Sequence, residues 1–203
     1  MTFRNAIVRP PGASFLQGLT TVDLGAPDLA LARTQHAAYC EALAACGLSL
    51  TWLPADERFP DSTFVEDTAV LTPRGAVLTR PGAASRAGEA AAIAPALASF
   101  FPRLRQIESP GTLDGGDVCE AGSSIFIGIS ERTNEEGARQ LAAFLRGDGY
   151  EVATVDIRGV PGILHLKSGV AALDEARLVV IPALQDHPAF RRHERLVVDP
   201  DES

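Results

Sequence analysis

Three carboxylates gather where a loop leads into an apolar segment. Asp61, Glu66 and Asp67 stand within FPDSTFVED, residues 59–67. Carboxylates that are partly buried among apolar neighbours are costly unless they meet a cation, and a guanidinium offers planar, paired donors to them. Strand alternation places Asp61 and Asp67 on one face and Glu66 on the other. The segment therefore predicts a site for a cationic group, and a turn before a solvated strand is the alternative.

A histidine and an acid that could orient it form the second candidate set. His165 lies in GILHLKSGV, residues 162–170, which has the apolar pattern of a strand. Histidine in such a strand is more often a core residue than a catalyst. The segment GTLDGGD, residues 111–117, offers Asp114 and Asp117, and its paired glycines permit a sharp turn that exposes a carboxylate. Ordinary turn chemistry is the alternative for both acids.

Two arginines follow predicted strand ends, where loops gather at one face of a sheet. Arg86 and Arg132 stand at or near the start of predicted helices. A cation early in a helix opposes the helix dipole, which favours a role elsewhere, such as binding a carboxylate. Solvation at the surface is the alternative for each.

The cysteines give no disulfide framework and no zinc-type spacing. Cys40 and Cys46 fall in an alanine-rich helical segment and are interpreted as packing residues. Cys119 follows the glycine turn and is the one cysteine kept as a candidate nucleophile. The sequence has no phosphate-binding glycine loop and no His-x-x-x-His pair, so we expect no cofactor and no metal.

The elements that position these residues follow a repeat. A strand near 6–8, a helix over 28–46 and a strand over 48–53 come first. Three copies of strand, strand, helix, strand follow at a spacing of about 50 residues, a scale typical of propellers. They are predicted at 65–71, 76–79, 86–100 and 106–107; at 118–120, 124–129, 134–145 and 151–155; and at 163–172, 177–181, a short helix near Pro188 and 196–198.

Composition limits the class of protein. The 203 residues are 46% apolar and 22% charged, with a net charge of −8 and a mean hydropathy of +0.08. These values favour a folded domain over disorder. The acidic balance and the absence of a basic stripe argue against nucleic-acid and membrane partners. With no apolar stretch long enough for a membrane helix or a leader, we predict a cytoplasmic protein.

Several ordered segments together resemble the dimethylargininase family of the guanidino-modifying superfamily. They are LPADE with FPD (53–61), FVED (64–67), RPGA with Arg86 (80–86), TLDGGD (112–117), RTN with Gly137 (132–137) and HLK (165–167). The resemblance implies a single α/β domain over residues 1–203, built as a five-bladed propeller. It also implies a small-molecule substrate, N-methylated L-arginine, hydrolysed to L-citrulline and a methylamine, and a possible homodimer.

The same resemblance assigns roles residue by residue. Asp61 and Asp67 would hold the guanidinium, with Glu66 beside them, and Arg86 and Arg132 would receive the α-carboxylate. Leu19 would close over the substrate and offer its backbone carbonyl to the α-amine. His165 would act as general acid and base, with Asp114 orienting it. Lys167 stands where related arginine deiminases carry an acid, which favours a methylated substrate.

The covalent step implied by the resemblance needs a cysteine on a closing strand. We expect that cysteine beyond residue 203, so that three units are complete, one is partial, and one unit with the closing strand is absent. The chain is then part of a longer enzyme, or a short product that binds a guanidino ligand without catalysis. Two further hypotheses are a subunit that borrows the missing unit from a partner, and another guanidino hydrolase such as an arginine deiminase.

Overall fold

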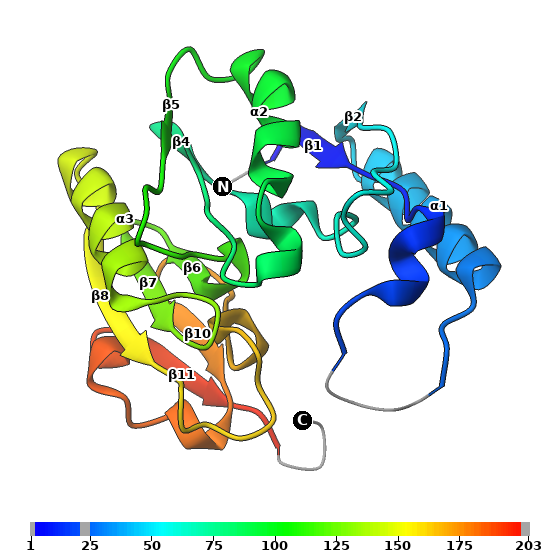
Figure 1. Ribbon diagram of the computed structural model, residues 1–203. Helices are drawn as coiled ribbons and strands as arrows, with labels where there is room; N and C mark the ends of the chain where they lie inside the picture. The colour runs from blue at the N-terminus through cyan, green and yellow to red at the C-terminus, as the bar shows by residue number, and fades with distance from the viewer. Residues whose placement is uncertain (1–2, 21–24, 200–203) are drawn as a thin grey trace.

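The chain folds as a series of small sheets that share one strand order. A computed structural model describes residues 3–20 and 25–199. In each complete unit the first two strands are antiparallel and the third is parallel to the second. These sheets are β3 (Ala69–Thr72), β4 (Gly75–Leu78) and β5 (Leu104–Gln106); β6 (Val118–Ala121), β7 (Ser124–Ile129) and β8 (Glu151–Asp156); and β9 (Val170–Ala172), β10 (Arg177–Val180) and β11 (Glu194–Val197). The predicted mixed α/β repeat is confirmed (Figure 1).

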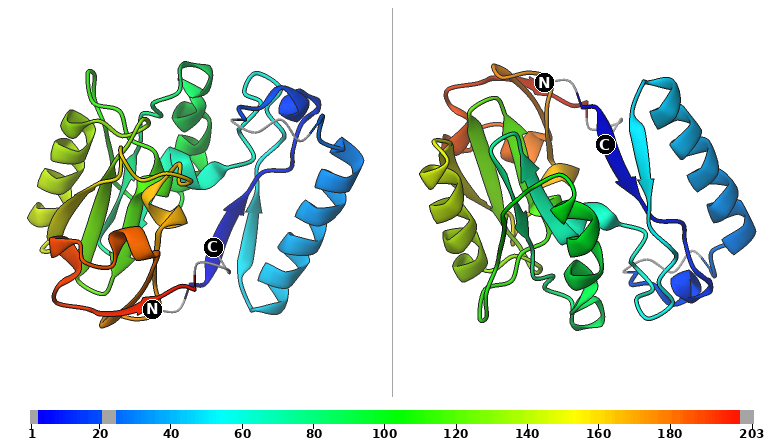
Figure 2. Two further views of the ribbon diagram at one scale, coloured as in Figure 1. Left: turned by 90° about the horizontal axis from the view of Figure 1, so that it is seen from below. Right: turned by 90° about the horizontal axis from the view of Figure 1, so that it is seen from above.

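The N-terminal unit contains only the parallel half of this pattern. β1 (Asn5–Val8) pairs with β2 (Ser49–Trp52), and the 3₁₀ helix η1 (Ala13–Gln17) and helix α1 (Leu29–Ala45) connect them. In both views of Figure 2, β1 lies on the side of this unit that faces the rest of the molecule. β2 lies next to β1, and α1 is outermost. Among residues 3–20 and 25–199, no strand pairs with the other edge of β1.

Side-chain caps mark the starts of two helices. Asp28 accepts hydrogen bonds from the N–H groups of Ala30 and Leu31 at the start of α1, and Asn134 caps α3 (Glu135–Gly147) through the N–H of Gly137.

The third unit has the 3₁₀ turns η6 (Pro182–Leu184) and η7 (Pro188–Phe190) in place of the predicted short α-helix. In the described part of the chain, no helix is both long enough and apolar enough to span a bilayer.

Two predicted strands are partly wrong. Residues 65–68 form the 3₁₀ turn η2 (Val65–Thr68) before β3, and residues 166–168 form η5 (Leu166–Ser168) before β9. The Thr68 hydroxyl donates to the Val65 carbonyl (2.7 Å), a local bond that competes with extended pairing. The alternation inferred for Asp61, Glu66 and Asp67 therefore does not hold, and His165 precedes a turn instead of lying within a strand.

The predicted helix over 86–100 is also shorter than expected. Helix α2 runs over Glu89–Ala98, and Gly88 before it has a left-handed φ of 102°. Arg86 ends a separate 3₁₀ turn, η3 (Ala84–Arg86). The dipole argument for Arg86 thus fails, because Arg86 is not in the first turn of α2.

The core forms between successive units, so both faces of β7 are buried. Ile125, Ile127 and Ile129 belong to an apolar cluster shared with the first complete unit and α3. Phe126 belongs to a second cluster shared with the third unit, where its ring meets Phe190 edge-on at 4.9 Å. Burial on both faces explains why this strand is apolar at almost every position.

Two glycines of α3 make a matched stability test. A Cβ at Gly137 would lie 1.9 Å from the Thr112 carbonyl oxygen, whereas a Cβ at Gly147 would meet nothing within 4 Å. We expect Gly137→Ala to lower the free energy of unfolding by about 1–3 kcal/mol or more, since backbone must move. Gly147→Ala should be neutral or slightly stabilising. Urea unfolding of both variants measures the difference, and equal midpoints would contradict the proposed close packing.

Candidate active site

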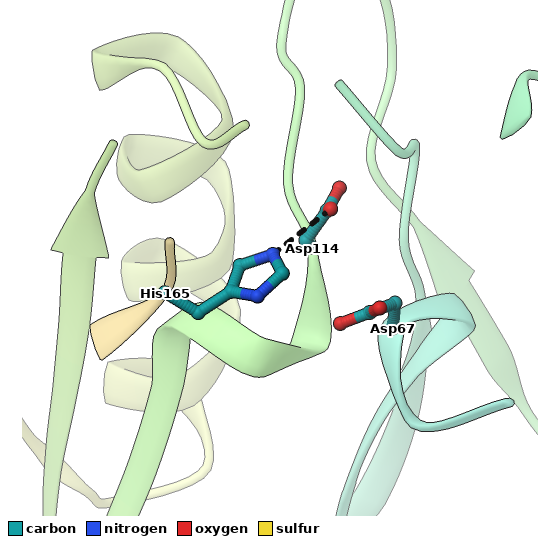
Figure 3. Close-up of side chains that lie close together, drawn as sticks. All are labelled: Asp67, Asp114 and His165. Carbon is teal, nitrogen blue, oxygen red and sulfur yellow. Dashed lines mark hydrogen bonds and ion pairs between the residues drawn. The ribbon is translucent and has the colours of Figure 1, made fainter. Parts of the chain in front are cut away.

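Three 3₁₀ turns, one before the first strands of each complete unit, pack together and bring three titratable side chains close to one another. Asp67 comes from η2, Asp114 precedes η4 (Gly115–Asp117), and His165 precedes η5. The imidazole of His165 points toward both carboxylates, and its Nε2 lies 3.2 Å from Asp114 Oδ2 (Figure 3). Asp67 and Asp114 are 7% and 1% exposed. The predicted histidine–acid pair is thus a contact in the structure.

The glycine pair 115–116 allows this approach. The N–H of Gly116 donates to Asp67 Oδ1 (2.9 Å). A Cβ at Gly116 would lie 2.8 Å from His165 Cγ, and one at Gly115 would lie 2.1 Å from the Glu66 carbonyl oxygen. Any side chain here would separate the turns, so glycine is required by space, not by a left-handed φ.

Hydrogen bonds and charge set the protonation of the pair. The N–H of Gly82 donates to Asp114 Oδ1 (2.9 Å). Burial alone would raise the pKa of Asp114, but the hydrogen bonds from His165 and Gly82 outweigh it and the pKa falls below its ordinary value. Burial alone would lower the pKa of His165, but Asp114 and the negative charge of Asp67 hold that pKa above its ordinary value. These contacts stabilise the imidazolium form of His165 and the carboxylate form of Asp114 relative to their neutral forms.

Arg86 lines the same cavity as Asp67 and is held by buried acids. Its Nη1 donates to Asp67 Oδ2 (2.6 Å), and its Nε and Nη2 donate to Glu89. Nη2 also donates to the Phe64 carbonyl, and Arg86 is 5% exposed. Burial raises the pKa of Glu89 despite this pairing. Whether Arg86 also reaches a substrate carboxylate stays a prediction, because these contacts occupy most of its donors.

All eight residues predicted for the site line one open cavity of about 1130 Å³. This cavity also extends along β1. The eight are Leu19, Asp61, Glu66, Asp67, Arg86, Asp114, Arg132 and His165.

Asp61 and Glu66 occupy different positions in this cavity. Asp61 is buried and accepts the N–H of Leu19 through both oxygens, at 3.1 and 3.3 Å. Glu66 is mostly exposed and pairs with Lys167 at 2.5 Å, which links η2 to η5. Lys167 stands at a position that is acidic in related arginine deiminases, and this departure was visible in the sequence. Nothing in the sequence indicated its contact with Glu66.

Arg132 is the available cation. Arg9 pairs with Asp56, Arg86 with Asp67 and Glu89, and Lys167 with Glu66. Among the arginines and lysine that line the cavity, and within the part of the chain that the structure describes, only the guanidinium of Arg132 makes no hydrogen bond or ion pair. Its backbone is fixed, since its N–H donates to Ser130 Oγ (3.0 Å).

Sequence reasoning missed the acid that holds Arg86. Glu89 is 3% exposed and stands three residues after Arg86. The spacing Arg-x-x-Glu could have indicated a pair on neighbouring turns. Nothing in the pattern indicated its burial.

The cysteines lie elsewhere. None of the three is among the described residues that line the cavity. Cys119 is 4% exposed inside the apolar cluster with Phe126, and burial raises the pKa of its thiol. Cys40 lies 3.6 Å from His36 Nδ1 in α1, and Cys46 is exposed. A protonated, enclosed thiol is a poor nucleophile, so this arrangement does not favour Cys119.

Asp67, Asp114 and His165 could also offer one ligand atom each to a cation, because these atoms lie within 4.8 Å of one another. Arg86 and Gly116 already donate to Asp67, and Gly82 donates to Asp114. A metal ion here would therefore share the carboxylate of Asp67 with the guanidinium of Arg86.

Comparison with known proteins agrees with this architecture. A family model described as arginine deiminase matches residues 57–199. Two relatives named N(G),N(G)-dimethylarginine dimethylaminohydrolase are 43% identical over 202 residues in Pseudomonas aeruginosa and 40% identical over 205 residues in Streptomyces coelicolor. These alignments cover 99% and 100% of this chain, and 78% and 77% of the relatives.

A crystal structure of the Pseudomonas aeruginosa enzyme superposes with a TM-score of 0.93 at 42% identity. The match covers 100% of this chain and 79% of that one, which is a cysteine-to-serine variant complexed with citrulline. Fold and sequence together define a hydrolase with a mixed α/β fold, in the arginine deiminase group. Within that group, the chain belongs to the dimethylarginine dimethylaminohydrolase family.

The raised pKa of His165 makes stability depend on pH. Relative to the ordinary pKa of 6.5, protonated His165 stabilises the folded state fully below pH 6.5. That contribution is lost as pH rises through the folded pKa. We expect the free energy of unfolding of the wild type, minus that of His165→Gln, to fall across this range in urea titrations. Parallel pH profiles for the two proteins would contradict the pairing with Asp114.

Proposed function

We propose that the chain is the substrate-binding and acid–base part of an enzyme that hydrolyses N-methylated L-arginine to L-citrulline and a methylamine. Asymmetric dimethylarginine and monomethylarginine are the proposed substrates. The observation that carries the proposal is the His165–Asp114 contact beside Asp67 in a cavity that all eight predicted residues line. The names of the relatives support the choice of substrate. A cytoplasmic location and a homodimer stay predictions.

The acids of the cavity fit the guanidinium end. Asp61 and Asp67 are the buried candidates and Glu66 is the exposed one, and a planar cation can hydrogen-bond to carboxylates in pairs. Lys167 already neutralises Glu66. A dimethylated nitrogen carries no N–H, so it would leave an unpaired acid unsatisfied. The Glu66–Lys167 pair therefore supports a methylated substrate over free arginine.

The other end of an amino acid needs a cation and an acceptor. The unpaired guanidinium of Arg132 is suited to the α-carboxylate, and Arg86 would assist only if it exchanged one of its present contacts. Leu19 lines the cavity, and its N–H is already held by Asp61. Its carbonyl is the proposed acceptor for the α-amine.

The proposed chemistry uses His165 twice. A cysteine thiolate attacks the guanidinium carbon, and the bond to the methylated nitrogen breaks as His165 gives that nitrogen a proton. The resulting thiouronium is hydrolysed when His165 takes a proton from water. The water oxygen bonds to carbon, the carbon–sulfur bond breaks to release citrulline and the thiolate, and the second water proton passes to solvent. Asp114 keeps the ring oriented through both steps.

We propose that this cysteine comes from outside the 203 residues. The chain's own cysteines do not line the cavity. β1 borders the cavity, and the described residues place no strand on its inner edge, whereas the equivalent strands β4, β7 and β10 each have an antiparallel neighbour. An antiparallel strand paired with β1 would complete the unit and could bring a cysteine to His165.

The function is tested by measuring binding and turnover together. We expect the 203-residue chain to bind asymmetric dimethylarginine in calorimetry without releasing citrulline. Protein that also carries the closing cysteine should release citrulline and dimethylamine in equal amounts, faster than it acts on free arginine. Release by the 203-residue chain would place the nucleophile within it. Loss of both binding and turnover in every form would refute the proposed function.

Arg132 offers a sharper test of substrate orientation. Arg132→Met should weaken binding of asymmetric dimethylarginine roughly 10- to 100-fold, because a charged hydrogen bond to the α-carboxylate is lost. The decarboxylated analogue with the same dimethylguanidino group is the matched ligand, and its affinity should not fall. An equal loss for both ligands, measured by calorimetry, would assign Arg132 to another role.

A further inference from the structure

Asp117 is a buried acid beside the site that the mechanism above does not use. It is 0% exposed and ends η4, three residues after Asp114. Its Oδ2 accepts hydrogen bonds from the hydroxyls of Ser130 (2.7 Å) and Thr133 (2.6 Å), and its Oδ1 accepts the N–H of Leu166 (3.0 Å). The carboxylate thus joins the loop after β7 to the start of η5.

The contact with Leu166 acts on the histidine. The N–H of Leu166 belongs to the same planar peptide group as the carbonyl of His165, so holding it restricts the backbone that carries the imidazole. Asp114 holds the other end of that residue through Nε2. Two acids of one four-residue turn therefore hold His165 at its ring and at its following peptide.

A second connection runs toward Arg132. Ser130 donates to Asp117, and the same Ser130 oxygen accepts the N–H groups of Arg132 and Thr133. The hydroxyl of Thr133 in turn accepts the N–H of Asp114 (3.1 Å). Through these contacts, the buried carboxylate of Asp117 orders the backbone of three residues that line the cavity. They are Asp114, Arg132 and His165.

We propose that Asp117 is a positioning residue for His165, which fixes the peptide after the histidine and keeps the imidazole against Asp114 in the cavity. The inference rests on the proposed acid–base role of His165. The inference goes further in one respect: removing Asp117, a side chain with no access to substrate, will change the titration of the His165 imidazole and its hydrogen bond to Asp114.

Charge gives the proposal a second consequence. The charged groups around His165 are Asp67 from η2, Asp114 and Asp117 from the glycine turn, and Arg86 and Lys167 nearby. The negative charge of Asp117 contributes to the raised pKa of His165. Burial raises the pKa of Asp117 itself, although the hydroxyls and the Leu166 N–H oppose this by donating to the carboxylate.

The test separates charge from geometry with two variants and NMR readouts that need no substrate. Asp117→Asn keeps an oxygen for the Leu166 N–H but loses the charge, so the His165 titration should move to lower pH while the ring stays bonded to Asp114. Asp117→Ala loses both the oxygen and the charge, so the ring should no longer be held against Asp114. The NMR resonance of the proton on His165 Nε2 (Hε2) should then disappear through exchange with solvent. The Leu166 amide should then exchange with solvent roughly tenfold faster or more. His165→Gln identifies the histidine signals.

Asp56→Asn is the matched control, because Asp56 is also buried and paired, with Arg9 and Arg58. It should leave the His165 titration unchanged. An unchanged titration in folded Asp117→Asn, or a persistent Hε2 resonance in folded Asp117→Ala, would overturn the proposal. If Asp117→Ala does not fold, rapid exchange of the Leu166 amide in the wild type would overturn it. Ligand binding measured in parallel reports separately on the proposed function.

Discussion

The site depends on the close approach of the Gly115–Gly116 backbone to its two neighbours. This turn touches the Glu66 carbonyl on one side and the His165 ring on the other, at distances that admit no Cβ. It also delivers a backbone N–H to Asp67. A backbone donor keeps its position with little loss of side-chain entropy, so η2 and the segment that carries His165 are aligned by main chain instead of by long, flexible side chains.

Burial of charge is the second constraint, and the structure meets it by pairing. Asp67 and Glu89 are both buried, and a single guanidinium, Arg86, serves both. Removing Arg86 would leave two buried acids unpaired, which is far more costly than losing an exposed ion pair. This explains why an arginine that looks like a ligand-binding residue in the sequence is also part of the support for Asp67.

The sequence predicted the repeat and the members of the site better than their local conformation. Caps such as Asp28 and Asn134 mark helix starts through short-range hydrogen bonds, and the prediction was accurate there. The turns η2 and η5 were missed because apolar periodicity does not distinguish a buried 3₁₀ turn from a strand over so few residues. The Glu66–Lys167 contact spans 101 positions, and no local pattern encodes such a pairing.

The pairing of Asp67 with Arg86 has a consequence for the proposed binding of a guanidinium substrate. A carboxylate has about four lone-pair positions, and Arg86 and Gly116 use one on each oxygen. The remaining positions can accept a second guanidinium without releasing the first. Arg86 also limits the negative charge that Asp67 presents to His165 and, in the proposed reaction, to a cationic substrate. In the proposed reaction, this partial neutralisation of Asp67 makes it easier for the imidazolium of His165 to give up its proton to the leaving nitrogen, because the charge of Asp67 otherwise stabilises the imidazolium.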